Sequence, residues 1–170
     1  MDIRDWIQAG LKASRSGLLR ALQGSVATGA APAQTASELP ELPREQLLWR
    51  PAPGSHGLGQ LIWHIADAED RLCCTAIRQE PFVRRFGARA FDPGAALPAW
   101  QDLMDYLDST RMRTVQAVAG LSLADLDAER DFYGHPLPLG ILLQQIIYHE
   151  AYHAGQIAHI LGMIRREGWV

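Results

Sequence analysis

The stretch that decides the fold is residues 138–167, which read PLGILLQQIIYHEAYHAGQIAHILGMIRRE. Apolar side chains recur every three or four positions along this stretch, and that spacing predicts one long amphipathic helix. Proline is favoured in the first turn of a helix, so we expect the helix to begin near Pro138. With a rotation of about 100° per residue, its buried stripe contains Leu142, Ile146, Ile157, Ile160 and Ile164.

Two histidines lie inside this apolar stripe. His149 and His153 are about 40° apart around the helix axis, and Gln145 and Gln156 fall on the same side. A buried polar group without a partner costs about 1–3 kcal/mol, so four such side chains on one buried face need a common explanation. A histidine pair at i and i+4 that chelates one metal ion supplies it. The alternative is two unrelated core histidines that are satisfied by hydrogen bonds.

A third ligand is available on the second predicted helix, residues 57–79. There His64 lies at the edge of an apolar arc formed by Leu61, Ile65, Ala68 and Leu72. Facing helices with axes about 8–10 Å apart can bring such side chains together. We therefore predict a metal site formed by His64, His149 and His153. Three imidazoles without a thiolate suit zinc, nickel or Fe(II), and they leave a coordination position open for water or substrate.

The rest of the chain predicts an all-α protein. Apolar residues at helical spacing indicate two more long helices, at about 3–23 and 98–119. Residues 24–54 form a long loop rich in Ala, Gly and Pro, with a short helical turn near 43–48, and Ser122–Asp125 forms a capping box. Four long helices without a strand pattern predict a four-helix bundle with long connecting loops, in a single domain over 1–170.

Composition and charge exclude several classes of function. The formal net charge is -3 and the arginines are scattered, so nucleic-acid binding is not expected. No apolar run approaches the roughly 20 residues that span a membrane, and the first residues lack signal-peptide features, so we expect a cytoplasmic protein. The two cysteines, Cys73 and Cys74, are adjacent, which suits neither a disulfide framework nor a C-x-x-C motif. We interpret them as small buried or half-buried hydrophobic residues.

The histidine pair also matches a zinc-protease pattern, H-E-x-x-H, in His149-Glu150-Ala151-Tyr152-His153. The extended form of that motif needs a glycine three residues after the second histidine, and this chain has Gln156 there. In an unbroken helix, His159 lies about 80° from His149 and about 120° from His153, too far round to share their metal. A protease is therefore the less favoured interpretation.

Three segments together resemble the DinB/YfiT-like family of metal-binding four-helix bundles, which is unrelated to the polymerase of similar name. They are LWRPAPG at 48–54, LIWHIADAE at 61–69 and HEAYHAGQI at 149–157. The resemblance covers most of the chain, and the last segment is the most specific. It implies that His64, His149 and His153 are the metal ligands, that the metal is commonly zinc or nickel, and that the protein is a homodimer. Some members of the family transfer a low-molecular-weight thiol to an electrophile.

Two hypotheses for function follow. The first is an enzyme that uses the open metal position to activate a water or a low-molecular-weight thiol for attack on a small electrophilic substrate, as a transferase or a hydrolase. In this hypothesis Glu150 is a candidate partner of a metal ligand or a candidate proton acceptor, and Arg71 is a candidate for binding an anionic group of the substrate. Gln145 and Gln156 are candidates for supporting or substrate contacts. The alternatives are that Glu150 faces solvent or pairs with another helix and that Arg71 is a surface arginine. The second is a non-catalytic metal-binding module of a stress response.

The face of the last helix opposite the histidines predicts a homodimer. It carries small or apolar residues where a bundle helix normally shows charge, namely Ile147, Ala151, Ala154, Ala158 and Gly162. Such a face lets another backbone approach closely. Packing against a neighbouring helix of the same chain is the alternative, and the resemblance to the DinB/YfiT-like family slightly favours a two-fold interface between identical subunits.

Overall fold

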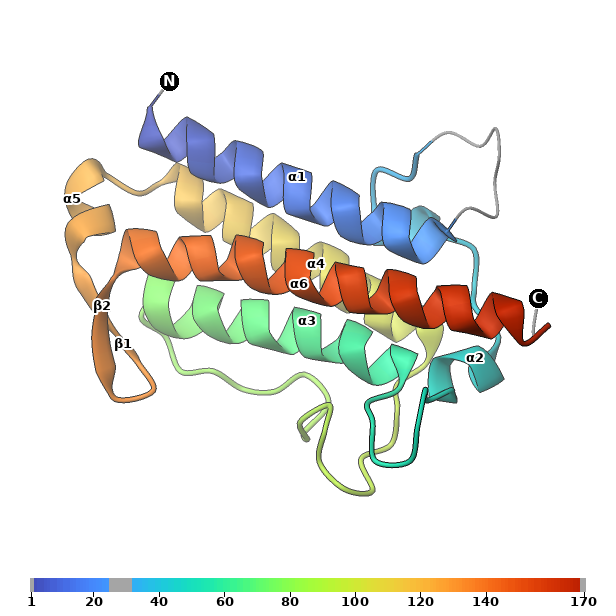
Figure 1. Ribbon diagram of the computed structural model, residues 1–170. Coiled ribbons are helices and arrows are strands. Elements are labelled where there is room, and N and C mark those ends of the chain that lie inside the picture. Colours follow the sequence, from blue (N-terminus) through green and yellow to red (C-terminus); the bar gives the residue numbers. More distant parts are fainter. Residues whose placement is uncertain (1, 25–31, 169–170) are drawn as a thin grey trace.

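A computed structural model describes residues 2–24 and 32–168 (Figure 1), and this part of the chain contains four long helices. They are α1 (Ile3–Gln23), α3 (Leu58–Leu72), α4 (Trp100–Ala119) and α6 (Leu139–Arg166). The predicted helical class is therefore confirmed. The second helix differs most from its prediction, because α3 ends at Leu72 and the chain continues through a π-helical turn, Cys73–Ile77.

The four long helices run alongside one another (Figure 1). α6 packs against α1 and α3, and α4 packs against the same two helices. Gly10 permits a close approach of α1 to α6, since a Cβ atom there would lie 2.6 Å from Cδ1 of Ile147. This arrangement places the histidine-bearing faces of α3 and α6 next to each other. No helix among the described residues is both long enough and apolar enough to cross a membrane.

The buried apolar side chains form two clusters, one toward each end of the helices. The larger contains Leu18, Trp63, Leu103 and Ile157, and the smaller contains Ile7, Leu11, Cys73, Val118 and Leu142. Between the clusters, each helix contributes buried polar or charged residues: Ser14 and Arg15 on α1, Glu69 on α3, Arg111 on α4 and Glu150 on α6. A polar layer therefore crosses the core at the level where α6 carries its histidines.

A small β-hairpin corrects the all-α prediction. β1 (Glu129–Phe132) pairs antiparallel with β2 (His135–Pro138). The two-residue turn, Tyr133-Gly134, has φ of 54° and 84°, the positive values that a tight hairpin turn requires. Phe132 and Leu137 pack against the smaller cluster, which holds the hairpin on the helices. The strands are short and β2 holds two prolines, so no alternating pattern marked them in the sequence.

The remaining connections contain short helical segments. The loop after α1 holds a 3-10 turn, Ala36–Glu38, whose backbone binds Asp108 of α4, and α2 (Arg44–Leu48). The predicted capping box at Ser122 opens α5 (Leu123–Asp127). Between α3 and α4, residues 78–99 form a loop that is held by Phe86, whose ring meets Trp63 and Tyr106 edge to face. Part of the predicted loop, residues 25–31, lies outside the described residues.

Candidate metal centre

The structure brings together the three histidines that the sequence singled out. His64 comes from α3, and His149 and His153 come from successive turns of α6. Nε2 of His149 lies 3.0 Å from Nε2 of His64 and 3.2 Å from Nε2 of His153. One ligand nitrogen from each ring lies within 4.8 Å of the other two, so the three rings could hold one metal ion.

The spacing of these nitrogens fits a metal better than a set of hydrogen bonds. Nitrogens that bind zinc at about 2.0–2.1 Å in tetrahedral geometry lie roughly 3.3 Å apart, close to the two shortest separations here. A neutral imidazole carries one proton on one of its two nitrogens. Nε2 of His149 can therefore donate to one neighbouring nitrogen at most, although two face it. A shared cation would satisfy all three lone pairs at once.

The protein surroundings keep these rings neutral. Burial, followed by the neighbouring imidazoles, lowers the pKa of His64 to about 3 and that of His149 to about 4. Burial also lowers the pKa of His153, against the opposing effect of its bond to Gln156. Metal ligation requires unprotonated imidazoles, so the three side chains are in the ligand form at neutral pH.

Gln156, one of the two glutamines predicted near the site, holds His153 in place. Its Oε1 lies 2.7 Å from Nδ1 of His153, and its Nε2 donates to the hydroxyl of Tyr152 at 3.2 Å. Because an amide oxygen accepts hydrogen bonds, Nδ1 of His153 carries the proton and Nε2 presents its lone pair. This is the orientation that metal ligation at Nε2 needs.

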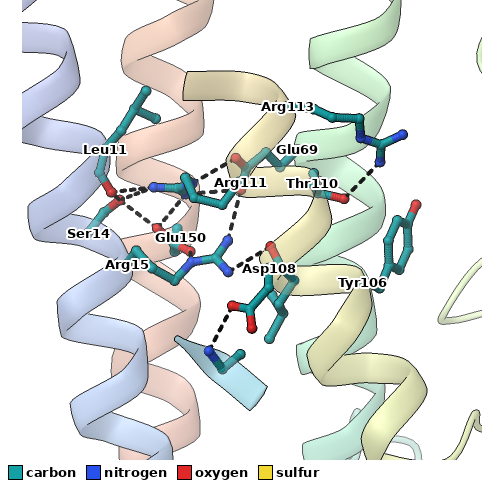
Figure 2. A network of polar contacts seen from close by, with 12 residues as sticks. Leu11, Ser14, Arg15, Glu69, Tyr106, Asp108, Thr110, Arg111, Arg113 and Glu150 are labelled. Carbon is teal, nitrogen blue, oxygen red and sulfur yellow. Dashed lines mark hydrogen bonds and ion pairs between the residues drawn. The ribbon is translucent and has the colours of Figure 1, made fainter. Parts of the chain in front are cut away.

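Glu150, the candidate proton acceptor, lies in the polar layer and is 1% exposed. Its carboxylate accepts hydrogen bonds from Ser14, from Nε of Arg15 at 2.7 Å and from Nη2 of Arg111 at 2.7 Å (Figure 2). Glu69 accepts from the same two arginines. The two arginines and the two glutamates thus form four ion pairs, which link α1, α3, α4 and α6.

A cavity of about 260 Å³ opens beside His64 and His149. Two other predicted residues, Arg71 and Gln145, line it. So do Asp131, Phe132 and Tyr133 at the tip of the hairpin. The cavity therefore runs from the two histidines, along α3 and α6, to the hairpin.

Several residues at the site were not found from the sequence. The hairpin tip was missed because the hairpin itself was not predicted. Phe91 was missed because it comes from an irregular loop; its ring lies 4.6 Å from that of His64 and stacks on His56 at 3.7 Å. Arg15, Glu69 and Arg111 could have been suspected only as charged positions on otherwise apolar helix faces.

The structure does not provide the arrangement that the extended protease motif requires. α6 continues without a break from Leu139 to Arg166, so the chain does not turn after His153. His159 is exposed and lies outside the cluster of His64, His149 and His153. The third histidine of the cluster therefore comes from α3 rather than from the later part of α6.

Comparisons with known proteins agree with the resemblance seen in the sequence. The family model of the DinB superfamily matches residues 27–157. Among solved structures, a DinB-like protein from Bacillus cereus ATCC 10987 matches with a TM-score of 0.61 and 23% identity, covering 94% of this chain and 92% of its own. At this identity the match supports a shared fold. No curated protein matches the chain.

Proposed function

This chain belongs to the DinB superfamily, and we propose that it is a metal-dependent enzyme whose metal ligands are His64, His149 and His153. The proposed metal is zinc or nickel, with Fe(II) as the third choice. We assign the four long helices to the DinB/YfiT type of four-helix bundle. The observation that carries the proposal is the convergence of three neutral imidazoles, two of which, His64 and His149, line a cavity.

The proposed reaction is addition of a water or a low-molecular-weight thiol to a small electrophile. A divalent ion held by three imidazoles would supply Lewis acidity, which lowers the pKa of a water or thiol in its remaining coordination position. The protein residues position the ligands: Gln156 orients His153, and burial keeps the rings unprotonated.

The thiol in this reaction would come from outside the chain. Cys73 is buried, and burial raises the pKa of its thiol. Burial together with Asp70 raises the pKa of Cys74 to about 11. Thiols are nucleophilic as thiolates, so at neutral pH neither cysteine is in the reactive form. This supports the interpretation of both residues as structural.

The second candidate is a non-catalytic metal-binding module of a stress response. One feature favours it: both glutamates that line the cavity with His149, Glu69 and Glu150, are held by arginines. Ion-paired carboxylates make poor proton acceptors. In an enzyme of this design, the proton of the activated water or thiol would therefore have to be taken up by the substrate or by the thiol itself. Metal binding without turnover of any thiol or ester would favour this alternative.

We also propose a homodimer that uses the exposed side of α6. Tyr148 and Tyr152 are 69% and 55% exposed, and Ala151 and Ala158 are exposed nearby. Ala154, which we expected at the interface, is only 7% exposed and packs within the larger core cluster. The proposed contact therefore lies over Ala151 and Ala158 rather than over Ala154.

The test is metal analysis of tag-free protein, followed by conjugation assays with several thiols and a reactive electrophile. Alanine at His64, His149 or His153 should abolish stoichiometric metal and conjugation, with the helical circular-dichroism signal retained. His159→Ala is the matched control and should keep both. A requirement for His159 together with full metal binding by His64→Ala would overturn the proposed site.

A further inference from the structure

Arg71 presents an unpaired cation to the cavity beside the histidines. Its guanidinium lies 4.1 Å from the centroid of the Tyr133 ring. Within residues 2–24 and 32–168, no carboxylate forms an ion pair with it and no acceptor forms a hydrogen bond with it. A guanidinium has five N–H donors, so their hydrogen-bonding capacity remains available to a ligand.

The carboxylates that could have paired with Arg71 have other partners. Asp67, one helical turn earlier on α3, lies 3.6 Å from Nε of Arg84. Asp131, which also lines the cavity, accepts a hydrogen bond from the backbone of Gly134 at 3.0 Å. Farther along the lining, Glu69 and Glu150 are each paired with two buried arginines. Arg71 is therefore the positive charge that this wall of the cavity offers to a ligand.

Tyr133 orients this cation. The ring comes from the tight hairpin turn and faces the guanidinium across the cavity wall. A guanidinium that stacks on an aromatic face keeps its N–H edge available, and that edge matches the two oxygens of a carboxylate. The hairpin thus contributes a specificity element that the helices alone would not provide.

The space between the two ends of the cavity limits the size and polarity of the ligand. Arg71 follows His64 by two turns of α3, a rise of about 10 Å. The lining includes the apolar side chains of Ile65, Leu72, Phe132 and Ile146. It also includes Glu69 and Glu150, whose carboxylates are paired with buried arginines. The cavity, at about 260 Å³, falls slightly below the usual range of about 300–1,000 Å³ for small-molecule sites. The ligand is accordingly a short molecule with an apolar middle.

We propose that Arg71 and Tyr133 form a carboxylate-binding subsite, and that the substrate is a small acid with an apolar segment between its carboxylate and its reacting end. The role of this acid as a substrate rests on the proposed function, whereas the binding of its carboxylate by Arg71 does not. The subsite can therefore be tested on protein from which metal has been removed.

The experiment compares phenylacetate with its uncharged analogue phenylacetamide by ligand-observed NMR titration of the metal-free full chain. Phenylacetate should bind about tenfold tighter or more, as expected for a hydrogen-bonded charge pair. Arg71→Gln should remove this preference. Tyr133→Asn, which removes the ring and suits the positive φ of the turn, should reduce it. Arg78→Gln, which changes an arginine paired with Glu80 on the surface, should leave it intact.

The outcomes separate this subsite from the metal centre. Equal binding of the two probes, or unchanged phenylacetate binding by a folded Arg71→Gln variant, would overturn the subsite. If phenylacetate binding requires added Zn²⁺ and is unchanged in the Arg71→Gln variant, the carboxylate binds the metal. That result would overturn the subsite but support the proposed function. A preference that depends on Arg71 in a chain that fails to bind metal would support the subsite and count against the proposed function.

Discussion

Oε1 of Gln156 lies 2.7 Å from Nδ1 of His153, three residues earlier on α6. This contact selects the tautomer of His153 that presents Nε2 toward His149. Loss of such a supporting partner typically weakens metal affinity by about 10- to 100-fold. We predict a loss of that order for Gln156→Ala, measured by competition with a chromophoric chelator. Gln156→Glu keeps an acceptor and should bind metal at least as well as the unmodified chain.

The control for this prediction is Gln144→Ala, since Gln144 is exposed on the first half of α6. It should leave metal affinity unchanged. If Gln156→Ala binds metal as tightly as Gln144→Ala does, the bond to Gln156 does not set the orientation of His153. The three rings would then be held by packing alone.

The buried ion pairs give a second prediction, on stability. Removing one partner of a buried pair leaves an uncompensated charge and costs about 3–5 kcal/mol. Glu150→Gln leaves Arg15 and Arg111 to share the single carboxylate of Glu69, so one buried positive charge is uncompensated. We therefore expect a loss of this size in the free energy of urea-induced unfolding. Glu80→Gln, which breaks a surface pair with Arg78, should cost less than about 1 kcal/mol.

A role for Glu150 as a proton acceptor would give a different result. Glu150→Gln would then lower turnover while leaving unfolding close to that of the unmodified chain. Equal stability of the Glu150→Gln and Glu80→Gln variants would contradict the structural role that the contacts with Ser14, Arg15 and Arg111 indicate.

Glu69 gives a prediction on pH dependence. Burial opposes ionisation, but Arg111 and Arg15 outweigh it and hold the pKa of Glu69 below its ordinary value of 4.5. As the pH falls below about 4.5, the unfolded chain takes up a proton before the folded chain does, so stability decreases. The contribution is fully present above that pH and is lost as the pH falls through the lower folded value.

The measurement is urea unfolding in the presence of chelator, at a series of pH values from neutral to acidic. The Glu69→Gln variant should start less stable at neutral pH and lose less stability on acidification. Parallel curves for the variant and the unmodified chain would show that Glu69 titrates alike in both states.

The sequence predicted those features that depend on local periodicity. The bounds of α1 and α6 agree with the predicted ones to within about a residue, because long apolar stripes and an N-terminal proline mark them. His149 and His153 could be paired because they share one helix face. His64 was harder to assign, since its role depends on how α3 packs against α6, and the resemblance to a known family supplied that information.

The polar layer and the hairpin could not be predicted from the periodicity of apolar residues. Arg15 and Glu150 are 135 positions apart, and nothing local to either residue identifies the other as its partner. The sequence around Arg111 does not distinguish it from an exposed helix arginine, and its role follows only from the packing of α4 against α1. The hairpin is stabilised by one tight turn and by the burial of Phe132 and Leu137 against the helices. This burial depends on the tertiary fold and cannot be predicted from the local sequence.

The last prediction concerns the proposed homodimer. Ala151 and Ala158 are exposed about two turns apart on α6, on the side that carries Tyr148 and Tyr152, so a charged side chain at either alanine would project into a partner helix. Ala151→Glu and Ala158→Glu should sediment as monomers that still bind one metal ion per chain. Met112→Glu changes another exposed apolar residue, on α4, and should remain dimeric. Ala154 is unsuitable for this test because it is buried within its own chain, where a charge would unfold the protein rather than divide a dimer. If the unmodified chain sediments as a monomer at high protein concentration, the exposed side of α6 is not a subunit interface.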